Sequence, residues 1–184
     1  MRVLIGLLLV VCLGALADPK PTNIDALRQF TLTNPVGTFI QKKHIKVLSQ
    51  PFISKGEYHF EPANGLTWTT IEPVQNQLMI NAKGISEIQH DGSSKLMTSD
   101  NAISAMMLTL FMGNDQQLSK EFVVEKRLGC LALIPINTQI KLMIDLITFC
   151  PADDQAVLSI IEVGGNKTEI QLLPIPLIIP PPNP

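Results

Sequence analysis

The stretch that decides the fold is Gly37–Pro73, which reads GTFIQKKHIKVLSQPFISKGEYHFEPANGLTWTTIEP. It contains three runs typical of β-strands, separated by residues that favour turns. The first connection holds Pro51 and Ser54, and the second extends from Pro62 to Gly65. We therefore predict an antiparallel meander whose strands cover Phe39–Leu48, Gly56–Glu61 and Leu66–Ile71.

Side chains alternate along this meander between an apolar and a polar face. In the second run Tyr58 and Phe60 share one face, while His59 and two glutamates occupy the other. Leu66 and Trp68 continue the apolar face in the third run. Because successive side chains of a strand point to opposite faces, this pattern predicts a sheet with one dry and one wet face.

Similar short patterns recur over most of the remaining chain. A tight turn is expected at Lys83-Gly84 and a loop at residues 91–94. Gly164-Gly165-Asn166 separates the two halves of the clearest hairpin. The predicted strands outside the opening meander are Gln77–Ala82, Ile85–His90, Phe122–Lys126, Gly129–Ile134, Leu142–Phe149, Val157–Val163 and Lys167–Leu173.

Helical spacing appears in two segments. The first is a short helix from Asn23 that ends before Asn34-Pro35, because the residue before a proline avoids the helical region. The second covers residues 98–112, with Thr98 or Ser99 as its cap, and ends at Gly113-Asn114. Its apolar stripe, at the spacing of an amphipathic helix, consists of Ile103, Met106, Met107, Leu110 and Phe111.

This stripe has two interpretations. Most apolar stripes on helices pack permanently into a core. The functional interpretation is a lid, because the unbranched side chain of methionine adapts to a surface that repacks around an irregular guest. The lid interpretation places an apolar ligand between the helix and the sheet.

The run Leu142–Phe149 is apolar on both faces, so each face needs a packing partner. One set is Leu142, Ile144 and Leu146, and Ile147 and Phe149 belong to the other. One face meets either a helix or a second sheet; the sequence leaves both open.

Cys130 and Cys150 are expected to lie opposite each other if their two strands pair antiparallel about a centre near Ile140. A disulfide between them would contribute about 3 kcal/mol in the chain-entropy model. The alternative is two buried free thiols.

The N-terminal residues 1–17 are predicted to be a cleavable export signal. Arg2 precedes an apolar run, Val3–Leu13, that is short for a membrane span. Ala15-Leu16-Ala17 has the small residues of a cleavage site. A lipoprotein signal using Cys12 is disfavoured, because Val11 is not the small residue such a signal requires. No stable membrane insertion is expected after cleavage.

Composition and motifs exclude several classes of function. The formal net charge of −2 argues against nucleic-acid binding, which requires a basic stripe. The histidines His44, His59 and His90 lack metal-ligand spacing, and no nucleophile elbow, phosphate loop or CxxC motif occurs. We therefore expect no enzyme, no metal site and no cofactor.

The order of motifs resembles the outer-membrane lipoprotein carrier family, LolA, most closely its LolA-like branch. The matching elements are Phe39–Gln41, Leu48–Pro51, Ser54–Gly56, Gly65-Leu66 with Trp68, and Pro73, and the pattern Thr168–Ile170 resembles the family's closing hairpin. The resemblance extends over nearly the whole chain after residue 17, although each motif is short.

The resemblance implies a mainly β protein with helices (α+β), namely an incomplete antiparallel β-barrel with a helical lid. It implies a carrier domain over residues 18–173, followed by a proline-rich tail over residues 174–184. It also implies a periplasmic carrier that shelters acyl chains of lipoproteins or related lipids, with an inner-membrane donor complex and an outer-membrane acceptor as partners. The residues expected to line the hydrophobic cavity and lid are Phe39, Tyr58, Phe60, Leu66, Trp68, Ile80, Ile103, Met106, Met107, Leu110 and Phe111.

One departure from the family pattern concerns the turn before the tryptophan strand. The founding carrier has an arginine there that ties lid to barrel, whereas this chain has Glu61-Pro62-Ala63. This departure argues against energised handover from the usual inner-membrane complex and leaves room for another cargo, such as a lipid or a polyene-type acyl product. The alternative function is a non-enzymatic interaction or structural protein whose β core is filled.

Overall fold

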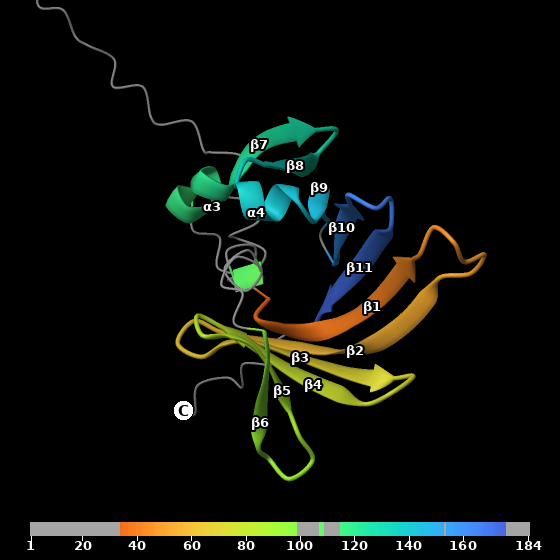
Figure 1. Cartoon of the computed structure of the whole chain (residues 1–184), viewed down its shortest axis with the longest axis vertical. Helices are drawn as coiled ribbons and strands as arrows, with labels where there is room; N and C mark the ends of the chain where they lie inside the picture. The colour runs from red at the N-terminus through yellow and green to blue at the C-terminus, as the bar shows by residue number, and fades with distance from the viewer. Residues whose placement is uncertain (1–33, 99–106, 109–114, 153, 176–184) are drawn as a thin grey trace, which may run out of the picture.

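The computed structural model describes residues 34–98, 107–108, 115–152 and 154–175. In this part of the chain, eleven strands form one antiparallel sheet (Figure 1). The strands are β1 (Val36–His44), β2 (Phe52–Glu61), β3 (Gly65–Glu72), β4 (Asn76–Asn81), β5 (Gly84–Ile88), β6 (Ser94–Thr98), β7 (Phe122–Arg127), β8 (Cys130–Pro135), β9 (Ile144–Pro151), β10 (Ala156–Glu162) and β11 (Lys167–Pro174). Two helices, α3 (Asp115–Glu121) and α4 (Thr138–Lys141), lie within the described residues beside the short helical stretch at residues 107–108.

The sheet is curved but does not close on itself. Its strand order is β6-β5-β4-β3-β2-β1-β11-β10-β9-β8-β7, so strands β6 and β7 form its two edges. The first and last strands of the sheet in the sequence, β1 and β11, pair at its centre and join its two halves. The described chain is thus a mainly antiparallel β structure with an unclosed sheet, which agrees with the predicted open barrel (Figure 1).

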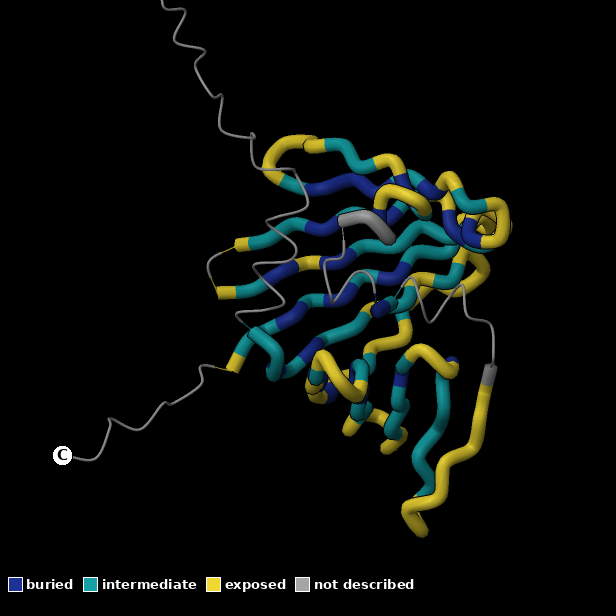
Figure 2. The backbone as a smooth tube through the Cα atoms, turned by 90° about the vertical axis from the view of Figure 1, so that its left-hand side faces the viewer, coloured by how far each residue is buried: buried dark blue, intermediate teal, exposed yellow. Residues whose placement is uncertain are grey.

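The core occupies the concave side of this sheet. Tyr58 pairs with Trp68, and Phe60 pairs with Leu66, so these side chains share one face as predicted. Leu66 in turn pairs with Ile80 of β4. Figure 2 shows buried positions recurring along the strands, while exposed positions gather at the connections. The alternation along β2 and β3 therefore identified the buried face correctly.

The connection between β1 and β2 lies earlier in the chain than predicted. Strand β1 ends at His44 rather than Leu48, since a turn closes from the amide of Leu48 to the carbonyl of Ile45 at 2.8 Å. The second strand begins at Phe52, so Ser54 is not a turn residue but pairs with Gln41 in the ladder. A continuous ladder satisfies more backbone donors than the shorter strand that we expected.

Strand β6 was not predicted, and it includes Thr98, one of the two residues proposed as the cap of the second helix; the other, Ser99, lies outside the described residues. Thr98 instead ends β6 and pairs with Ile85. Residues 94–97 of this edge strand are all exposed, so they carry no alternation of buried and exposed side chains. Helix α3 was missed because its sequence, DQQLSKE, has a single apolar residue.

Helix α4 directly precedes the predicted strand Leu142–Phe149, and strand β9 begins only at Ile144. Asn137 caps it, its side chain accepting hydrogen bonds from the amides of Gln139 and Ile140. Leu142 is the C-cap and is 72% exposed, so its assignment to a strand was wrong.

A bulge changes the faces of strand β9. Ile144 pairs with Glu162 and Leu146 pairs with Ile161, which leaves Asp145 as an extra residue. The extra residue brings Ile144 to the side of Ile147 and Phe149, all three of which are buried. The predicted grouping of Ile144 with Leu146 was therefore wrong.

Cys130 and Cys150 form a disulfide across β8 and β9. Leu131 pairs with Phe149, and this register brings the two cysteines opposite each other. The bridge closes a loop with a sequence separation of 20, and loops of this size contribute about 3 kcal/mol in the chain-entropy model.

Strand β11 extends one residue into the predicted tail. Pro174 pairs with Gly37, and the amide of Ile175 donates to the carbonyl of Val36 at 3.1 Å. Proline is accepted here because it lies at the end of the strand. The predicted export signal, the helix from Asn23 and the rest of the tail lie outside the described residues.

Candidate functional site

An aromatic stack forms the floor of the concave face. The rings of Phe39 and Trp68 lie 3.8 Å apart between centroids, at an interplanar angle of 21°. The ring of Tyr58 is also stacked with that of Trp68, at a centroid distance of 6.5 Å. These residues come from β1, β2 and β3, which are adjacent in the sheet. All three are nearly buried, with 1% of Phe39, 2% of Tyr58 and 7% of Trp68 exposed.

Two glycines make room for these rings. A Cβ atom added at Gly37 would lie 2.5 Å from the hydroxyl oxygen of Tyr58. One added at Gly56 would lie 2.8 Å from Cε1 of Phe39. Each ring therefore lies directly over a position without a side chain, which lets the aromatic residues rest close to the backbone of the sheet.

The structure brings all of the predicted sheet residues into one cluster. Phe60, Leu66 and Ile80 extend the aromatic stack toward β4, and each is buried. The structure thus shows that these side chains belong to one buried cluster. That they contact a ligand is a proposal.

Two residues of the segment predicted to form a lid lie within the described part of the chain. Met107 and Leu108 are helical, and Figure 1 shows them within the concave side of the sheet. Leu108 belongs to the buried cluster with 9% exposure, and Met107 packs against that cluster. The burial of Leu108 was not predicted, because Leu108 does not belong to the predicted apolar stripe. The other stripe residues lie outside the described residues; they are Ile103, Met106, Leu110 and Phe111.

The second half of the sheet contributes apolar residues to the site that we did not predict. These residues lie on β7 to β11 and belong to the same hydrophobic cluster as the aromatic stack. Their signal was present as alternation in the last hairpin, but nothing in the sequence showed that this hairpin pairs with β1. The residues are Phe122, Leu131, Leu133, Ile147, Phe149, Leu158, Ile170 and Leu172.

Two hollows on the surface of the described residues are lined by neither Tyr58 nor Trp68. One, of about 400 Å³, lies at the ends of β3, β4 and β5 and is lined mainly by polar residues, His90 among them. The other, of about 290 Å³, surrounds Gly56 and includes Phe39 as its one predicted site residue. The apolar side chains of the site that the structure describes are buried and belong to one cluster.

Burial raises the pKa of Tyr58 from 10.0 to about 12, because the ionised phenolate would lose its hydration. Its hydroxyl lies 3.4 Å from the carbonyl oxygen of Asn34, to which it donates. Tyr58 is the single tyrosine of the chain, so its ionisation can be followed without overlap.

We expect the near-ultraviolet absorbance of tyrosinate to appear near pH 12 in the folded protein and near pH 10 in the unfolded chain. Because the folded pKa is the higher one, the stability linked to neutral Tyr58 is complete below pH 10 and is lost as the pH rises toward 12. A titration of the native protein that ends near pH 10 would contradict the burial of this ring.

Ionisable groups elsewhere form surface pairs. His44 lies 3.2 Å from Glu169, and His59 lies 3.5 Å from Glu61. In the described part of the chain, no three His, Cys, Asp or Glu side chains gather as a group that would hold a metal ion. The described side chains on the concave face are apolar, so they can contribute to binding by burying apolar surface.

The fold and the site together define a class: an open antiparallel β shell whose concave face carries aromatic and aliphatic side chains. The family model for the outer membrane lipoprotein carrier protein LolA matches residues 31–180. The chain belongs to this family, as its sequence motifs predicted. No curated protein matches the chain significantly. None of the helices in the described residues has the length and apolar character needed to cross a membrane.

Proposed function

We propose that this protein is a periplasmic carrier that shelters acyl chains of lipoproteins, or of related lipids, on the concave face of its sheet. The observation that carries the proposal is the continuous apolar surface around the stack of Phe39, Trp68 and Tyr58, in a sheet that does not close. Membership of the lipoprotein carrier family supports the same function.

In this mechanism, the guest replaces the segment that carries Met107 and Leu108. The described arrangement is closed, because Leu108 is itself part of the buried cluster. An acyl chain that displaces this segment exchanges one apolar partner of the sheet for another. Each methylene that leaves water contributes about 0.8 kcal/mol, so a long chain supplies enough free energy to offset the opening.

Loading and release follow from the same exchange. The carrier accepts its cargo from an inner-membrane donor, and the segment closes again after delivery to an outer-membrane acceptor. Glu61 occupies the turn where the founding carrier has its arginine, and here it accepts a hydrogen bond from Asn64 within the turn. This contact stays within the turn and does not tie the barrel to the lid. We therefore propose that the cargo itself drives opening.

The alternative is an interaction or structural protein with a filled β core. The near-complete burial of the aromatic stack favours it, since no guest is needed to cover these rings. The two functions differ in one respect: only a carrier opens to admit an acyl chain.

Native mass spectrometry of protein purified from the periplasm without detergent tests the proposal. We expect adducts with acyl-lipid or lipoprotein masses, which Trp68→Ser removes. Val123→Ser is the matched control, because Val123 lies on strand β7 and is 46% exposed. A bare mass, together with no uptake of added fatty acids or lipopeptides, would support the filled-core alternative.

A further inference from the structure

Exposed apolar side chains gather at one end of the sheet. The register places the β1–β2, β3–β4, β5–β6 and β10–β11 connections at this end, and the β2–β3, β4–β5, β7–β8 and β9–β10 connections at the other. We call six residues of the first end the rim. They are Val47, Leu48, Phe52 and Ile53 of the β1–β2 connection and its flanks, Val163 of the β10–β11 turn, and Leu142 after α4.

The rim residues are unusually exposed for apolar side chains. Val47 is 87% exposed, Leu142 is 72% exposed and Phe52 is 61% exposed. Val47, Leu48 and Val163 lie in connections between strands, whereas Phe52 and Ile53 begin strand β2 and Leu142 follows α4. The β1–β2 connection projects from the body of the protein (Figure 1). Large exposed apolar side chains gathered at one end mark an interaction surface.

Hydrogen bonds hold the parts of the rim together. The amide of Lys46 donates to Oδ1 of Asn166 at 3.1 Å, which ties the β1–β2 connection to the β10–β11 turn. The amide of Val163 donates to the carbonyl of Met143 at 3.0 Å, which ties that turn to the residue after Leu142. The three connections therefore lie beside one another.

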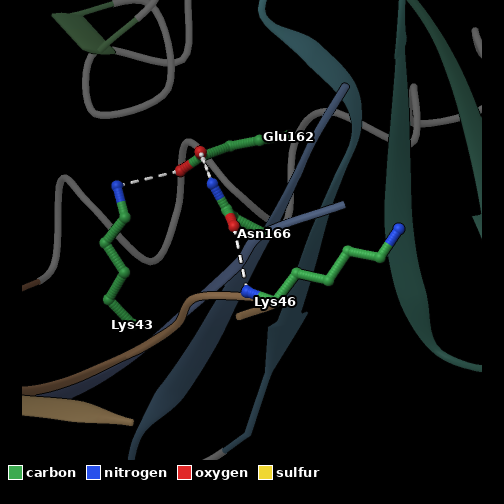
Figure 3. A network of polar contacts seen from close by, with 4 residues as sticks. All are labelled: Lys43, Lys46, Glu162 and Asn166. Atoms are coloured by element: carbon green, nitrogen blue, oxygen red, sulfur yellow. Dashed lines mark hydrogen bonds and ion pairs between the residues drawn. The ribbon is translucent and has the colours of Figure 1, made fainter. Parts of the chain in front are cut away.

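A polar network fixes this arrangement (Figure 3). Nδ2 of Asn166 donates to Glu162 at 3.1 Å, and Nζ of Lys43 lies 3.1 Å from the other oxygen of the same carboxylate. The hydrogen bond from Asn166, followed by the lysine, lowers the pKa of Glu162 and keeps its charge. The side chain of Lys46 points away from this network in Figure 3.

The charge of the rim differs from that of the whole chain. Residues 42–55 contain four lysines and no aspartate or glutamate, although the formal net charge of the protein is −2. Glutamates neutralise Lys43 and Lys55 in ion pairs of 3.1 Å and 2.9 Å. Among the residues that the structure describes, Lys42 and Lys46 have no acidic partner, and both are exposed. Lys141 adds a third exposed ammonium group beside Leu142.

We propose that the rim docks the protein onto the surface of an anionic lipid bilayer. The apolar tips enter the headgroup region while the unpaired lysines lie against lipid phosphates. Peripheral binding of this kind grows with buried apolar area and with attraction to anionic lipids. The exposed apolar rim residues match the headgroup region of a bilayer, and the unpaired lysines match its anionic phosphates. This inference goes beyond the carrier function and does not depend on cargo.

Flotation of the periplasmic protein with vesicles tests the proposal. We expect at least tenfold stronger binding to vesicles of equal phosphatidylglycerol and phosphatidylcholine than to phosphatidylcholine alone, and weaker binding at high salt. The triple variant Val47→Ser, Leu48→Ser, Phe52→Ser and the single variant Lys46→Glu should each lower binding about tenfold. Because these side chains are exposed, the unfolding midpoints should not change.

Leu128→Ser is the matched control. Leu128 is fully exposed and follows Lys126 and Arg127, but it lies at the opposite end of the sheet. Its replacement should leave vesicle binding unchanged. Equal binding to both kinds of vesicle, no binding to either, or an equal loss in the Leu128 variant would overturn the proposal. A loss of cargo delivery in the triple variant without any vesicle binding would assign the rim to a protein partner instead.

Discussion

Leu108→Ala is expected to bind an acyl chain about tenfold more tightly than the unmodified protein. Leu108 occupies the buried cluster that the guest must enter, so its side chain and the guest compete for the same surface. Truncation of a buried leucine to alanine costs about 2 kcal/mol or more. Most of that cost falls on the guest-free state, in which Leu108 is buried, so less free energy is needed to displace the segment. A reduction of about 1.4 kcal/mol corresponds to a tenfold gain in affinity. Displacement of a fluorescent fatty acid measures the change.

Leu158→Ala is the control for this effect. Leu158 belongs to the same cluster with 3% exposure, but it lies on strand β10, which remains in place when the guest enters. Both variants should lower the free energy of unfolding, whereas only Leu108→Ala should tighten binding. Equal affinities in the two variants would mean that the segment around Leu108 is a permanent part of the core.

Gly56→Ala is expected to lower the free energy of unfolding by about 3 kcal/mol, the upper part of the range for overpacked cores. The added Cβ would overlap the carbonyl oxygen of Thr69, which is backbone and has no rotamer to escape into. It would also lie 2.8 Å from Cε1 of Phe39 and would push that ring against Trp68. Urea denaturation measures the loss.

The matched control is Gly164→Ala, because a Cβ at Gly164 meets no atom within 4 Å. This variant should unfold within about 0.5 kcal/mol of the unmodified protein, as for other exposed substitutions. If Gly56→Ala were equally harmless, the close packing of Phe39 onto the sheet would be wrong.

The sequence was most informative where alternation was strong. Tyr58, Phe60, Leu66 and Trp68 follow a strict period of two, and the structure buries all four on one face. The cysteines were informative for a related reason: antiparallel pairing about one centre makes their positions opposite, and the structure joins them.

The sequence was less informative where structure depends on contacts between distant segments. The bulge at Asp145 shifts Ile144 to another face, and a periodicity analysis has no means of detecting one extra residue. The edge strand β6 lacks any buried face in residues 94–97, so neither period applies to it. The pairing of β1 with β11 joins residues far apart in the chain and decides which walls face the aromatic stack.

The rim went unnoticed for a different reason. The net charge of −2 gives no sign of this surface, because net charge averages over a chain whose lysines are unevenly placed. Which of those lysines lack partners depends on the pairing of β1 with β2 and β11, as the ion pair between Lys43 and Glu162 shows.

Quenching of tryptophan fluorescence by a brominated acyl chain tests the central claim most directly. Trp68 is the single tryptophan of the chain and lies within the proposed binding face. A carrier predicts saturable quenching by the brominated chain, competition by the same chain without bromine, and no quenching in a Trp68→Phe, Val123→Trp variant whose tryptophan is on the exposed side of β7. Unchanged Trp68 fluorescence at saturating acyl chain would contradict the account.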